Sequence, residues 1–163
     1  MLNKRFITFE GGEGSGKSTQ IKILKNKLSK RHKVITTREP GGTKEAEYIR
    51  NLLVKGKSSK WSGTTEVLLN FTARKDHVDK IILPSLKKNM WVLCDRFSDS
   101  TLAYQGYGRN VSEDFIKDLN KSLINNLKPK ITFLFDIDPK IGLRRSKRRN
   151  NNELRYENMP LSY

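Results

Sequence analysis

Residues 11–18, GGEGSGKS, fit the phosphate-binding pattern G-x-x-x-x-G-K-[ST]. An apolar, β-prone run at residues 6–9 precedes the segment, and apolar residues at helical spacing follow it at Ile21, Leu24 and Leu28. A strand, a glycine-rich loop and a helix N-terminus in this order turn backbone N–H groups toward phosphate oxygens. The sequence therefore predicts a fold built around a phosphate-binding loop, with a glycine-rich turn that matches by chance as the alternative.

The side chains of this loop carry separate roles in the predicted site. We expect Lys17 to reach the β- and γ-phosphates of a nucleoside triphosphate and the Ser18 hydroxyl to ligate Mg²⁺. An acidic residue is unusual where phosphates bind, and Glu13 occupies such a position; simple exposure at the rim of the loop is its alternative role. The predicted ATP-binding residues are Gly11, Gly12, Glu13, Gly14, Ser15, Gly16, Lys17, Ser18 and Thr19.

The net charge of +16 comes from 33 Lys and Arg against 17 Asp and Glu in 163 residues, a length typical of one domain, residues 1–163. A nucleic-acid-binding surface requires basic residues gathered on one face. Here they are spread along the chain, and only residues 144–149 form a dense cluster. The composition therefore favours solvated helix faces over a specific nucleic-acid partner, which stays the alternative interpretation.

The sequence shows no membrane span or signal peptide and a single cysteine, and these features constrain the cellular compartment of the protein. No stretch of 18 apolar residues is present, so we expect no membrane span, and the first residues run into the first strand without room for a signal peptide. Cys94 is the single cysteine, so no internal disulfide can form, and its apolar surroundings indicate a small core residue. These features predict a cytoplasmic protein.

Strands and helices are predicted to alternate along the chain. Strands are expected at about residues 5–10, 34–37, 91–94 and 131–135, the last two as buried runs; helices are expected at about 17–31 and 43–55, from 65 to 86 with a kink at Pro84, from 112, and from 139. Such alternation indicates a parallel sheet, and ligands of parallel sheets bind beyond the carboxyl ends of the strands. Charged residues suited to phosphate mark these ends at residues 10–18, 38–42 and 95–96.

Four motifs in order make the sequence similar to bacterial thymidylate kinases, which pass a phosphoryl group from ATP to dTMP. They are FEGGEGSGKSTQ at 9–20, TREPGGT at 37–43, DRF at 95–97 and AYQGYGR at 103–109. The resemblance implies an α/β protein with the P-loop nucleoside monophosphate kinase fold, a helix-flanked parallel sheet with strand order 2-3-1-4. It also implies Mg²⁺ as the cofactor, ATP and dTMP as substrates, and a homodimer formed through helices that flank the sheet.

The acceptor side of the site is predicted mainly from this resemblance. It implies that Arg38 and Arg96 bind the acceptor phosphate, a role suited to a guanidinium fork at a strand end, whereas an ion pair with Glu39 is the alternative for Arg38. Asp95 is expected to hold Mg²⁺-bound water or to orient the acceptor, with a helix cap as its alternative. The predicted dTMP-binding residues are Arg38, Phe71, Arg74, Arg96, Thr101, Tyr104 and Gln105.

Two aromatic residues in this set have competing structural roles. The resemblance makes Phe71 a stacking platform for the base beside Arg74, although Phe71 could equally be a core residue. It makes Tyr104 the ring that crowds the 2′ position of the sugar and so favours deoxyribose; a purely structural tyrosine is the alternative. Thr101 and Gln105 are expected at the edge of the base.

The basic stretch resembles the lid of this family, at about residues 140–155. Because the glycine loop contains no arginine, we expect the lid to supply the cation that stabilises the transition state, from Arg145 and Arg149, with Arg148 and Arg155 as further candidates. A basic helix end stabilised by the helix dipole is the alternative. The predicted catalytic residues are Lys17, Glu13, Asp95, Arg96, Arg145 and Arg149, and the metal ligands are Ser18 and Asp95.

The sequence departs from the family pattern at two places. Phe97 stands where many members have tyrosine, and the sequence ends soon after the lid, whereas members continue through another helix, a final strand and a terminal helix. We therefore expect a truncated chain that lacks the usual fifth strand and leaves residues 131–135 as an apolar sheet edge. Two other functions stay open: another nucleotide or nucleoside kinase on the same scaffold, and a non-catalytic P-loop protein that binds nucleic acid.

Overall fold

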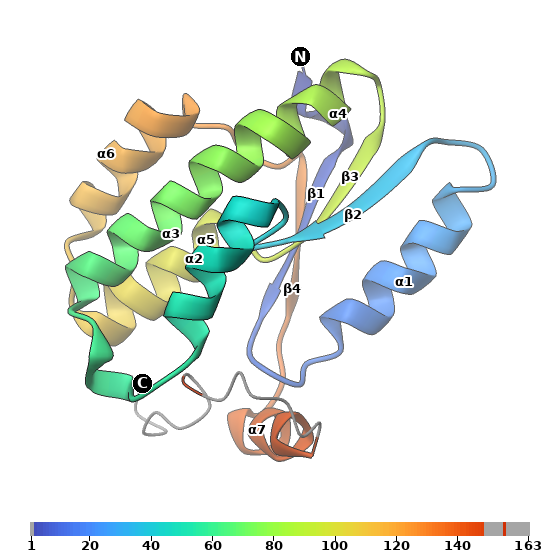
Figure 1. The fold of residues 1–163 in the computed structure, drawn as a ribbon. Helices are drawn as coiled ribbons and strands as arrows, with labels where there is room; N and C mark the ends of the chain where they lie inside the picture. Colours follow the sequence, from blue (N-terminus) through green and yellow to red (C-terminus); the bar gives the residue numbers. More distant parts are fainter. Residues whose placement is uncertain (1, 149–154, 156–163) are drawn as a thin grey trace.

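The computed structural model describes residues 2–148 and 155, and its centre is a sheet of four parallel strands (Figure 1). The strands are β1 (Phe6–Gly11), β2 (Val34–Arg38), β3 (Trp91–Asp95) and β4 (Ile131–Phe135). Their order across the sheet is β2-β3-β1-β4, which confirms the predicted order. Because β1 is central, its carboxyl end delivers the glycine loop to the middle of the sheet edge.

Helices cover both faces of this sheet. The longer ones are α1 (Lys17–Leu28), α2 (Lys44–Val54), α3 (Gly63–His77), α6 (Glu113–Ile124) and α7 (Pro139–Lys147). The shorter ones are α4 (Leu83–Lys87), α5 (Ser98–Thr101) and the 3₁₀ turns Leu2–Arg5 and Ser58–Lys60. Two π-helical segments, Val78–Ile82 and Leu102–Tyr107, continue α3 and α5.

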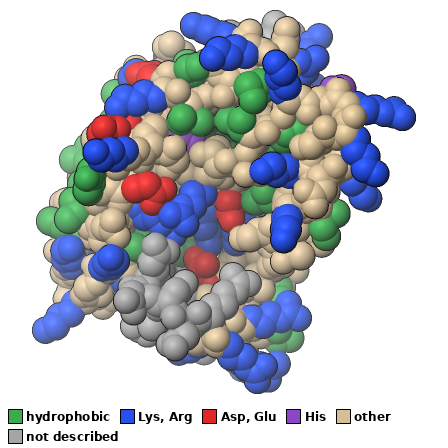
Figure 2. All heavy atoms as spheres, turned by 45° about the vertical axis from the view of Figure 1, so that its right-hand side comes forward, with side chains coloured by type: hydrophobic (Ala, Val, Ile, Leu, Met, Phe, Trp, Pro, Cys, Tyr) green, Lys and Arg blue, Asp and Glu red, His purple; other side chains and the backbone are tan. Residues whose placement is uncertain are grey.

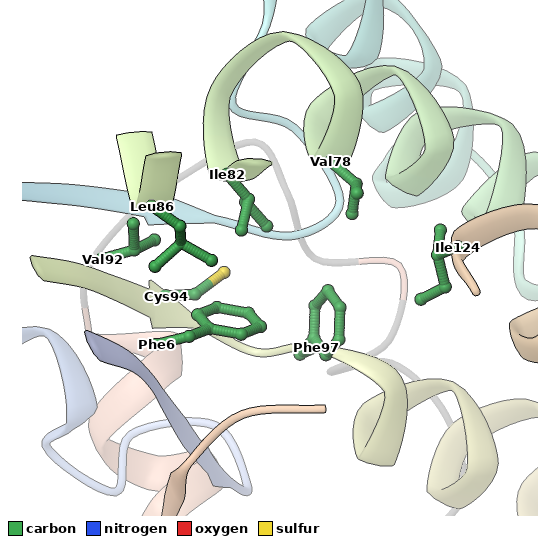
Figure 3. Close-up of a cluster of buried hydrophobic side chains, with 8 residues drawn as sticks. All are labelled: Phe6, Val78, Ile82, Leu86, Val92, Cys94, Phe97 and Ile124. Carbon is green, nitrogen blue, oxygen red and sulfur yellow. The ribbon is translucent and has the colours of Figure 1, made fainter. Parts of the chain in front are cut away.

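Alternating side chains of β1 and β3 divide the core into two layers. On the α1 side, Ile7, Phe9 and Leu93 pack with Ile21. On the opposite side, a cluster joins the two strands to the helical run after α3 and to the end of α6 (Figure 3). Its members are Phe6, Val78, Ile82, Leu86, Val92, Cys94, Phe97 and Ile124. Full burial of both strands explains their near-continuous apolar sequence, and it confirms that Cys94 is a core residue.

Three helices begin at capping residues near the positions expected from the sequence. The side chain of Thr43 accepts a hydrogen bond from Ala46 N, and Ser112 and Asp138 cap α6 and α7 in the same way. Asn89, which follows the helical run before β3, adopts the left-handed conformation typical of a helix end, with φ 57°. The predicted kink near Pro84 is realised as the π-helical segment Val78–Ile82, directly before α4.

The sheet edge at β4 corrects one expectation and confirms another. The apolar run predicted a buried strand, but Ile131, Phe133 and Leu134 are 45%, 43% and 74% exposed. Among the described residues β4 pairs with β1 alone, so it is the edge strand anticipated for a sheet without a fifth strand.

The surface carries basic side chains in a dispersed pattern. Figure 2 shows Lys and Arg spread around the visible face, whereas acidic and basic side chains meet near its middle. Within residues 2–148 no helix has both the length and the apolar character needed to cross a bilayer.

Candidate active site

The glycine loop between β1 and α1 wraps around the lysine of the motif. Lys17 Nζ donates to the carbonyl oxygens of Gly11 and Gly12 at 2.9 and 2.8 Å and lies 3.4 Å from Ser15 Oγ. Gly16 occupies the N-cap position of α1 in the left-handed region, with φ 97°, where a side chain would be strained. Burial, together with the nearby cation of Arg96, lowers the pKa of Lys17 to about 8.

Ser18 and Asp95 bring two oxygen donors together beside this loop. Ser18 Oγ donates to Asp95 Oδ2 at 3.2 Å, and Asp95 Oδ1 is buried without a hydrogen-bond partner among the described residues. A hydroxyl and a carboxylate are ligands that suit Mg²⁺, which commonly takes one or two protein oxygens and completes its shell with phosphates and water. The pair therefore fits such a metal, although residues 2–148 contain no cluster of three or more His, Cys, Asp or Glu able to hold one. The cap alternative for Asp95 is wrong, because Phe97 occupies the N-cap position of α5.

Arg96 connects the end of β3 to the glycine loop. Its Nη1 donates to Gly11 O at 3.0 Å, and its Nη2 forms an ion pair with Glu13 Oε1 at 2.5 Å. The guanidinium lies 5.1 Å from the ring centroid of Tyr104, whose hydroxyl is 3.5 Å from Glu13. Glu13, Tyr104 and Asp95 raise the pKa of Arg96 although burial acts in the opposite direction. Glu13 thus has a partner, so it does more than line an exposed rim.

A cavity opens between the glycine loop, α3 and the helical segment after β3. Six of the predicted site residues line it: Glu13, Arg74, Arg96, Thr101, Tyr104 and Gln105. Glu13, Arg96 and Tyr104 come from three separate motifs, and their convergence supports the prediction that these motifs form one site. Its wall also includes Glu39, Pro40, Arg50, Asn70 and Phe97, which were not predicted as ligand contacts.

Arg74 is buried in the wall of this cavity. Its Nε donates to Glu39 Oε2 at 2.7 Å, and its Nη2 donates to Thr101 Oγ1 at 2.8 Å and to Phe97 O at 3.2 Å. Nη1 is buried and has no hydrogen-bond partner among the described residues. A buried donor without a partner is costly, so the geometry favours a ligand acceptor at this position.

Phe71 and Arg38 lie at the margin of this arrangement. The ring of Phe71 is 1% exposed, belongs to a core cluster with Val67, and lies 4.9 Å below the Arg74 guanidinium, so it packs in the core while supporting that cation. Arg38 is half exposed and pairs with Glu47 at 2.9 Å. The alternative that paired Arg38 with Glu39 is therefore wrong, because Glu39 turns inward to Arg74.

The predicted lid begins with α7, which lies directly against the glycine loop. A Cβ at Gly14 would be 2.2 Å from Gly142 O and 3.0 Å from Arg145 Cβ, and a Cβ at Gly142 would be 2.4 Å from Glu13 O. Only glycine fits on both sides of this contact. It places the stem of Arg145 beside the loop, whereas the predicted catalytic residue Arg149 lies outside the described residues.

Arg155, a further candidate for the lid cation, has a different role. It is buried, it donates to the carbonyl oxygens of Leu53, Lys57 and Ser58 at 2.9 Å each, and it forms an ion pair with Glu66 at 2.5 Å. These contacts occupy its guanidinium on the α2–α3 side of the molecule. The structure therefore corrects the suggestion that Arg155 provides the transition-state charge.

Three buried acidic residues that support the site were not predicted. Glu10 accepts hydrogen bonds from Phe97 N at 2.7 Å and Ser100 Oγ at 2.5 Å, and burial raises its pKa. Glu39 holds Arg74, and Glu66 accepts a hydrogen bond from Gln105 at 2.9 Å. Glu66 could have been suspected because helical spacing places it amid apolar positions of α3, where an unpaired carboxylate is not tolerated.

Comparisons with known proteins agree with this geometry. The family model described as thymidylate kinase matches residues 9–161. A thymidylate kinase of Magnetococcus marinus is 49% identical over 163 residues, covering 99% of this chain and 78% of the relative, and one of Caulobacter vibrioides is 45% identical, covering 97% and 76%. The crystal structure of thymidylate kinase from Ehrlichia chaffeensis matches with a TM-score of 0.76 and 42% identity, over 90% of this chain and 79% of that one.

Proposed function

The chain belongs to the thymidylate kinase family, and from this premise we propose that it transfers the γ-phosphoryl group of ATP to dTMP, yielding ADP and dTDP. One observation carries the proposal. Arg74 of α3 and Arg96, which directly follows β3, meet in one cavity, and Arg96 is also hydrogen-bonded to Gly11 of the glycine loop. A donor loop and an acceptor cavity that share an arginine suit transfer between two phosphates.

On the donor side, backbone N–H groups of the glycine loop and the ammonium group of Lys17 bind the triphosphate. The N–H groups of residues 12–18 and the N-terminus of α1 attract phosphate oxygens, and Lys17 can exchange its loop carbonyls for the β- and γ-phosphates. Ser18 and Asp95 would hold Mg²⁺, which supplies positive charge to the bridging oxygens when bound. Thr19, the third residue of α1, completes the proposed ATP site.

The acceptor side positions dTMP for attack by one of its phosphate oxygens. Arg96 is placed to bind the acceptor phosphate, and Arg38 can join it by leaving its exposed pair with Glu47. Arg74 Nη1 offers a donor to a carbonyl of the pyrimidine, with Thr101 and Gln105 at the edge of the base. Tyr104, fixed over Arg96, is the proposed barrier to a 2′-hydroxyl.

Charge that develops on the transferred group needs a cation that arrives with the substrates. We assign this role to Arg145, on the helix that touches the glycine loop, and to Arg149. Cations aimed at the phosphoryl group lower the barrier by electrostatic stabilisation, which is the main contribution in reactions of this kind.

We further propose that the enzyme works as a homodimer. The neighbouring helices α2 and α3 expose apolar side chains, with Tyr48 63%, Leu52 43% and Leu68 48% exposed. Burying such residues against a second copy would remove them from water. Analytical ultracentrifugation of wild type and Leu52→Glu tests this, because the charged variant should sediment as a monomer; a wild-type monomer would refute the proposal.

The function is tested by product analysis with a panel of acceptors. Purified protein with Mg²⁺-ATP is supplied with dTMP, dUMP, dCMP, dGMP or dAMP, and the diphosphates are separated by chromatography. The proposal expects dTDP as the main product, and it expects Lys17→Met to abolish turnover while Lys22→Met, on the exposed surface of α1, retains it. A clear preference for dCMP, dGMP or dAMP would favour another nucleotide kinase. Unchanged turnover by Lys17→Met would exclude both the thymidylate kinase and the other nucleotide kinase.

A further inference from the structure

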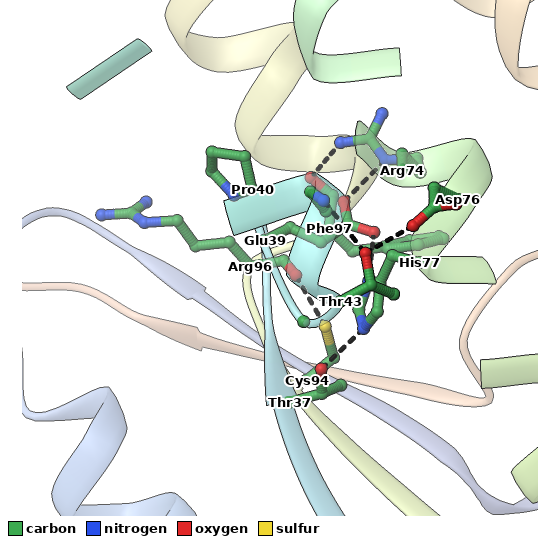
Figure 4. A network of polar contacts seen from close by, with 12 residues as sticks. Thr37, Glu39, Pro40, Thr43, Arg74, Asp76, His77, Cys94, Arg96 and Phe97 are labelled. Atoms are coloured by element: carbon green, nitrogen blue, oxygen red, sulfur yellow. Dashed lines mark hydrogen bonds and ion pairs between the residues drawn. The ribbon is translucent and has the colours of Figure 1, made fainter. Parts of the chain in front are cut away.

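A buried chain of polar groups leads from β2 to the cavity (Figure 4). His77 Nε2 lies 2.6 Å from Thr37 Oγ1, and His77 Nδ1 lies 3.1 Å from Glu39 Oε1. The other oxygen of Glu39 accepts from Arg74 Nε at 2.7 Å. His77 is completely buried and is not among the cavity-lining residues, so it can reach a substrate only through the groups that it holds.

The surrounding chain is shaped to accommodate this imidazole. A Cβ at Gly42 would be 2.4 Å from His77 Cδ2 and 2.7 Å from Thr37 Oγ1, and Gly42 has a φ of 94°. A side chain at Gly42 would therefore displace the ring from Glu39. His77 and Arg74 are three residues apart on α3, so the helix presents both side chains to the same carboxylate.

The partners assign the hydrogen-bond roles of the ring. A carboxylate can only accept, so Nδ1 carries the proton that it donates to Glu39, while the Thr37 hydroxyl, which can donate or accept, is the partner of Nε2. Burial alone would raise the pKa of Glu39, but Arg74 and His77 outweigh burial and hold that pKa below its ordinary value. Glu39 is thereby kept ionised between two donors.

This arrangement fixes the direction of the Arg74 guanidinium. Glu39 holds Nε, and Thr101 and Phe97 O hold Nη2, so Nη1 is left as the buried donor without a partner among the described residues. Rotation of the Glu39 carboxylate would release Arg74 Nε and turn Arg74 Nη1 away from the cavity. The His77 contact prevents that rotation because it ties down the second carboxylate oxygen.

We propose that His77 is a positioning residue for the acceptor: by orienting Glu39 it aims Arg74 Nη1 at the pyrimidine, and it thereby sets the affinity for the nucleoside monophosphate. This inference rests on the proposed function, since it assumes that the cavity receives the acceptor base. The hydrogen bond from His77 Nδ1 to Glu39, rather than the volume of the ring, is then the feature that sets this affinity.

Three substitutions separate that contact from packing. In His77→Asn the amide nitrogen can replace Nδ1 opposite Glu39. In His77→Gln the amide lies near the place of Nε2 and can reach only Thr37. His77→Leu keeps apolar volume and removes both contacts. For His77→Leu we expect KM for dTMP to rise about tenfold, which corresponds to about 1.4 kcal/mol, with KM for ATP within about twofold of wild type. His77→Asn should recover most of the loss, and His77→Gln should resemble His77→Leu.

Two outcomes would overturn the inference: equal rises in KM for dTMP and ATP, or rescue by His77→Gln as complete as that by His77→Asn. If His77→Leu does not fold, Thr37→Val tests the same chain of contacts, because it removes one of the two partners of the imidazole. KM for dTMP should then rise by a smaller factor than expected for His77→Leu, while KM for ATP stays within about twofold of wild type; no selective rise in KM for dTMP would contradict the inference. If wild type prefers another monophosphate, the proposed function fails. The contacts from His77 through Glu39 to Arg74 still predict a selective rise in KM for that acceptor.

A spectroscopic measurement tests the contacts from His77 through Glu39 to Arg74 without measuring turnover. In ¹⁵N-resolved NMR spectra the Nε–H of Arg74 should give a slowly exchanging signal in wild type, since it is buried against Glu39. The signal should persist in His77→Asn and be lost to exchange in His77→Leu. Its persistence in His77→Leu would show that Glu39 holds Arg74 unaided and would refute the role of His77.

Discussion

The arginines on the two sides of the cleft are held in opposite ways. Arg74 and Arg96 on the acceptor side are fixed by the carboxylates of Glu39 and Glu13. Arg145 on α7 is exposed and forms no hydrogen bond or ion pair with another residue of the described ranges. A buried guanidinium must be paired to offset its desolvation, and the pairing fixes its direction before a ligand binds. An exposed guanidinium keeps its freedom and gains a partner only when phosphates are present.

The difference explains how one site can select an acceptor and still exclude water during transfer. A preorganised acceptor cavity recognises the base without paying for rearrangement at each binding event. A lid arginine that is ordered late contributes mainly to the transition state, where its interaction accelerates the reaction. Under the proposed function, the two regions would divide recognition and catalysis between fixed and recruited cations.

The largest expected effect comes from breaking the buried pair on the acceptor side. Glu39→Gln leaves Arg74 as an uncompensated buried cation, so we expect the free energy of unfolding to fall by about 3–5 kcal/mol. The matched control is Glu47→Gln, which removes the exposed partner of Arg38 and should cost about 0–1 kcal/mol. Denaturant unfolding of the two variants measures the contrast, and equal losses would contradict a preorganised acceptor side.

A smaller effect is expected where α7 meets the glycine loop. Alanine in place of Gly142 would favour the helix by about 1 kcal/mol on propensity alone, but its Cβ would collide with Glu13 O at 2.4 Å. We therefore expect kcat to fall about tenfold, the size of a 1.4 kcal/mol rise in the barrier, without a lower melting temperature. Lys140→Ala, an exposed change on the same helix, is the control. An unchanged kcat in Gly142→Ala would show that this contact does not position the lid.

A pH dependence of stability is expected from Lys17. Burial, with Arg96 beside it, lowers the pKa of Lys17 to about 8, while the pKa in the unfolded chain is about 10.5. Between these values the unfolded state holds more protons, so the stability of the folded state rises as pH increases from about 8 to about 10.5. Chemical denaturation across this range should show that rise in wild type relative to Lys17→Met. A constant difference between the two proteins would refute the shift.

Much of the fold could be predicted because local patterns determine it. Apolar runs predicted the strands, and the family resemblance implied their order. Helix starts were expected near residues 43, 112 and 139, where the structure has the capping side chains of Thr43, Ser112 and Asp138. The helical character of residues 98–107 was not anticipated. Polar residues and a glycine hide any apolar periodicity there, and the segment is held by tertiary contacts such as that of Ser100 with Glu10.

The candidate site was predicted where motifs are contiguous and missed where partners are distant in sequence. The set around the cavity followed from the family resemblance, but the partner of Glu39 did not, because adjacency suggested Arg38 whereas the fold brings Arg74 from 35 residues away. His77 gave no sequence signal beyond its helical spacing from Arg74. Long-range pairing of buried charges depends on packing that no local pattern encodes.

The most direct test of the account is dTMP binding in the absence of ATP, measured by titration calorimetry for wild type, Arg74→Gln and Arg145→Ala. A preorganised acceptor side predicts that wild type and Arg145→Ala bind dTMP with the same affinity, that Arg74→Gln binds at least about tenfold more weakly, and that only Arg145→Ala loses kcat while keeping dTMP affinity. Equal weakening of dTMP binding by Arg74→Gln and Arg145→Ala would contradict the division between fixed and recruited arginines.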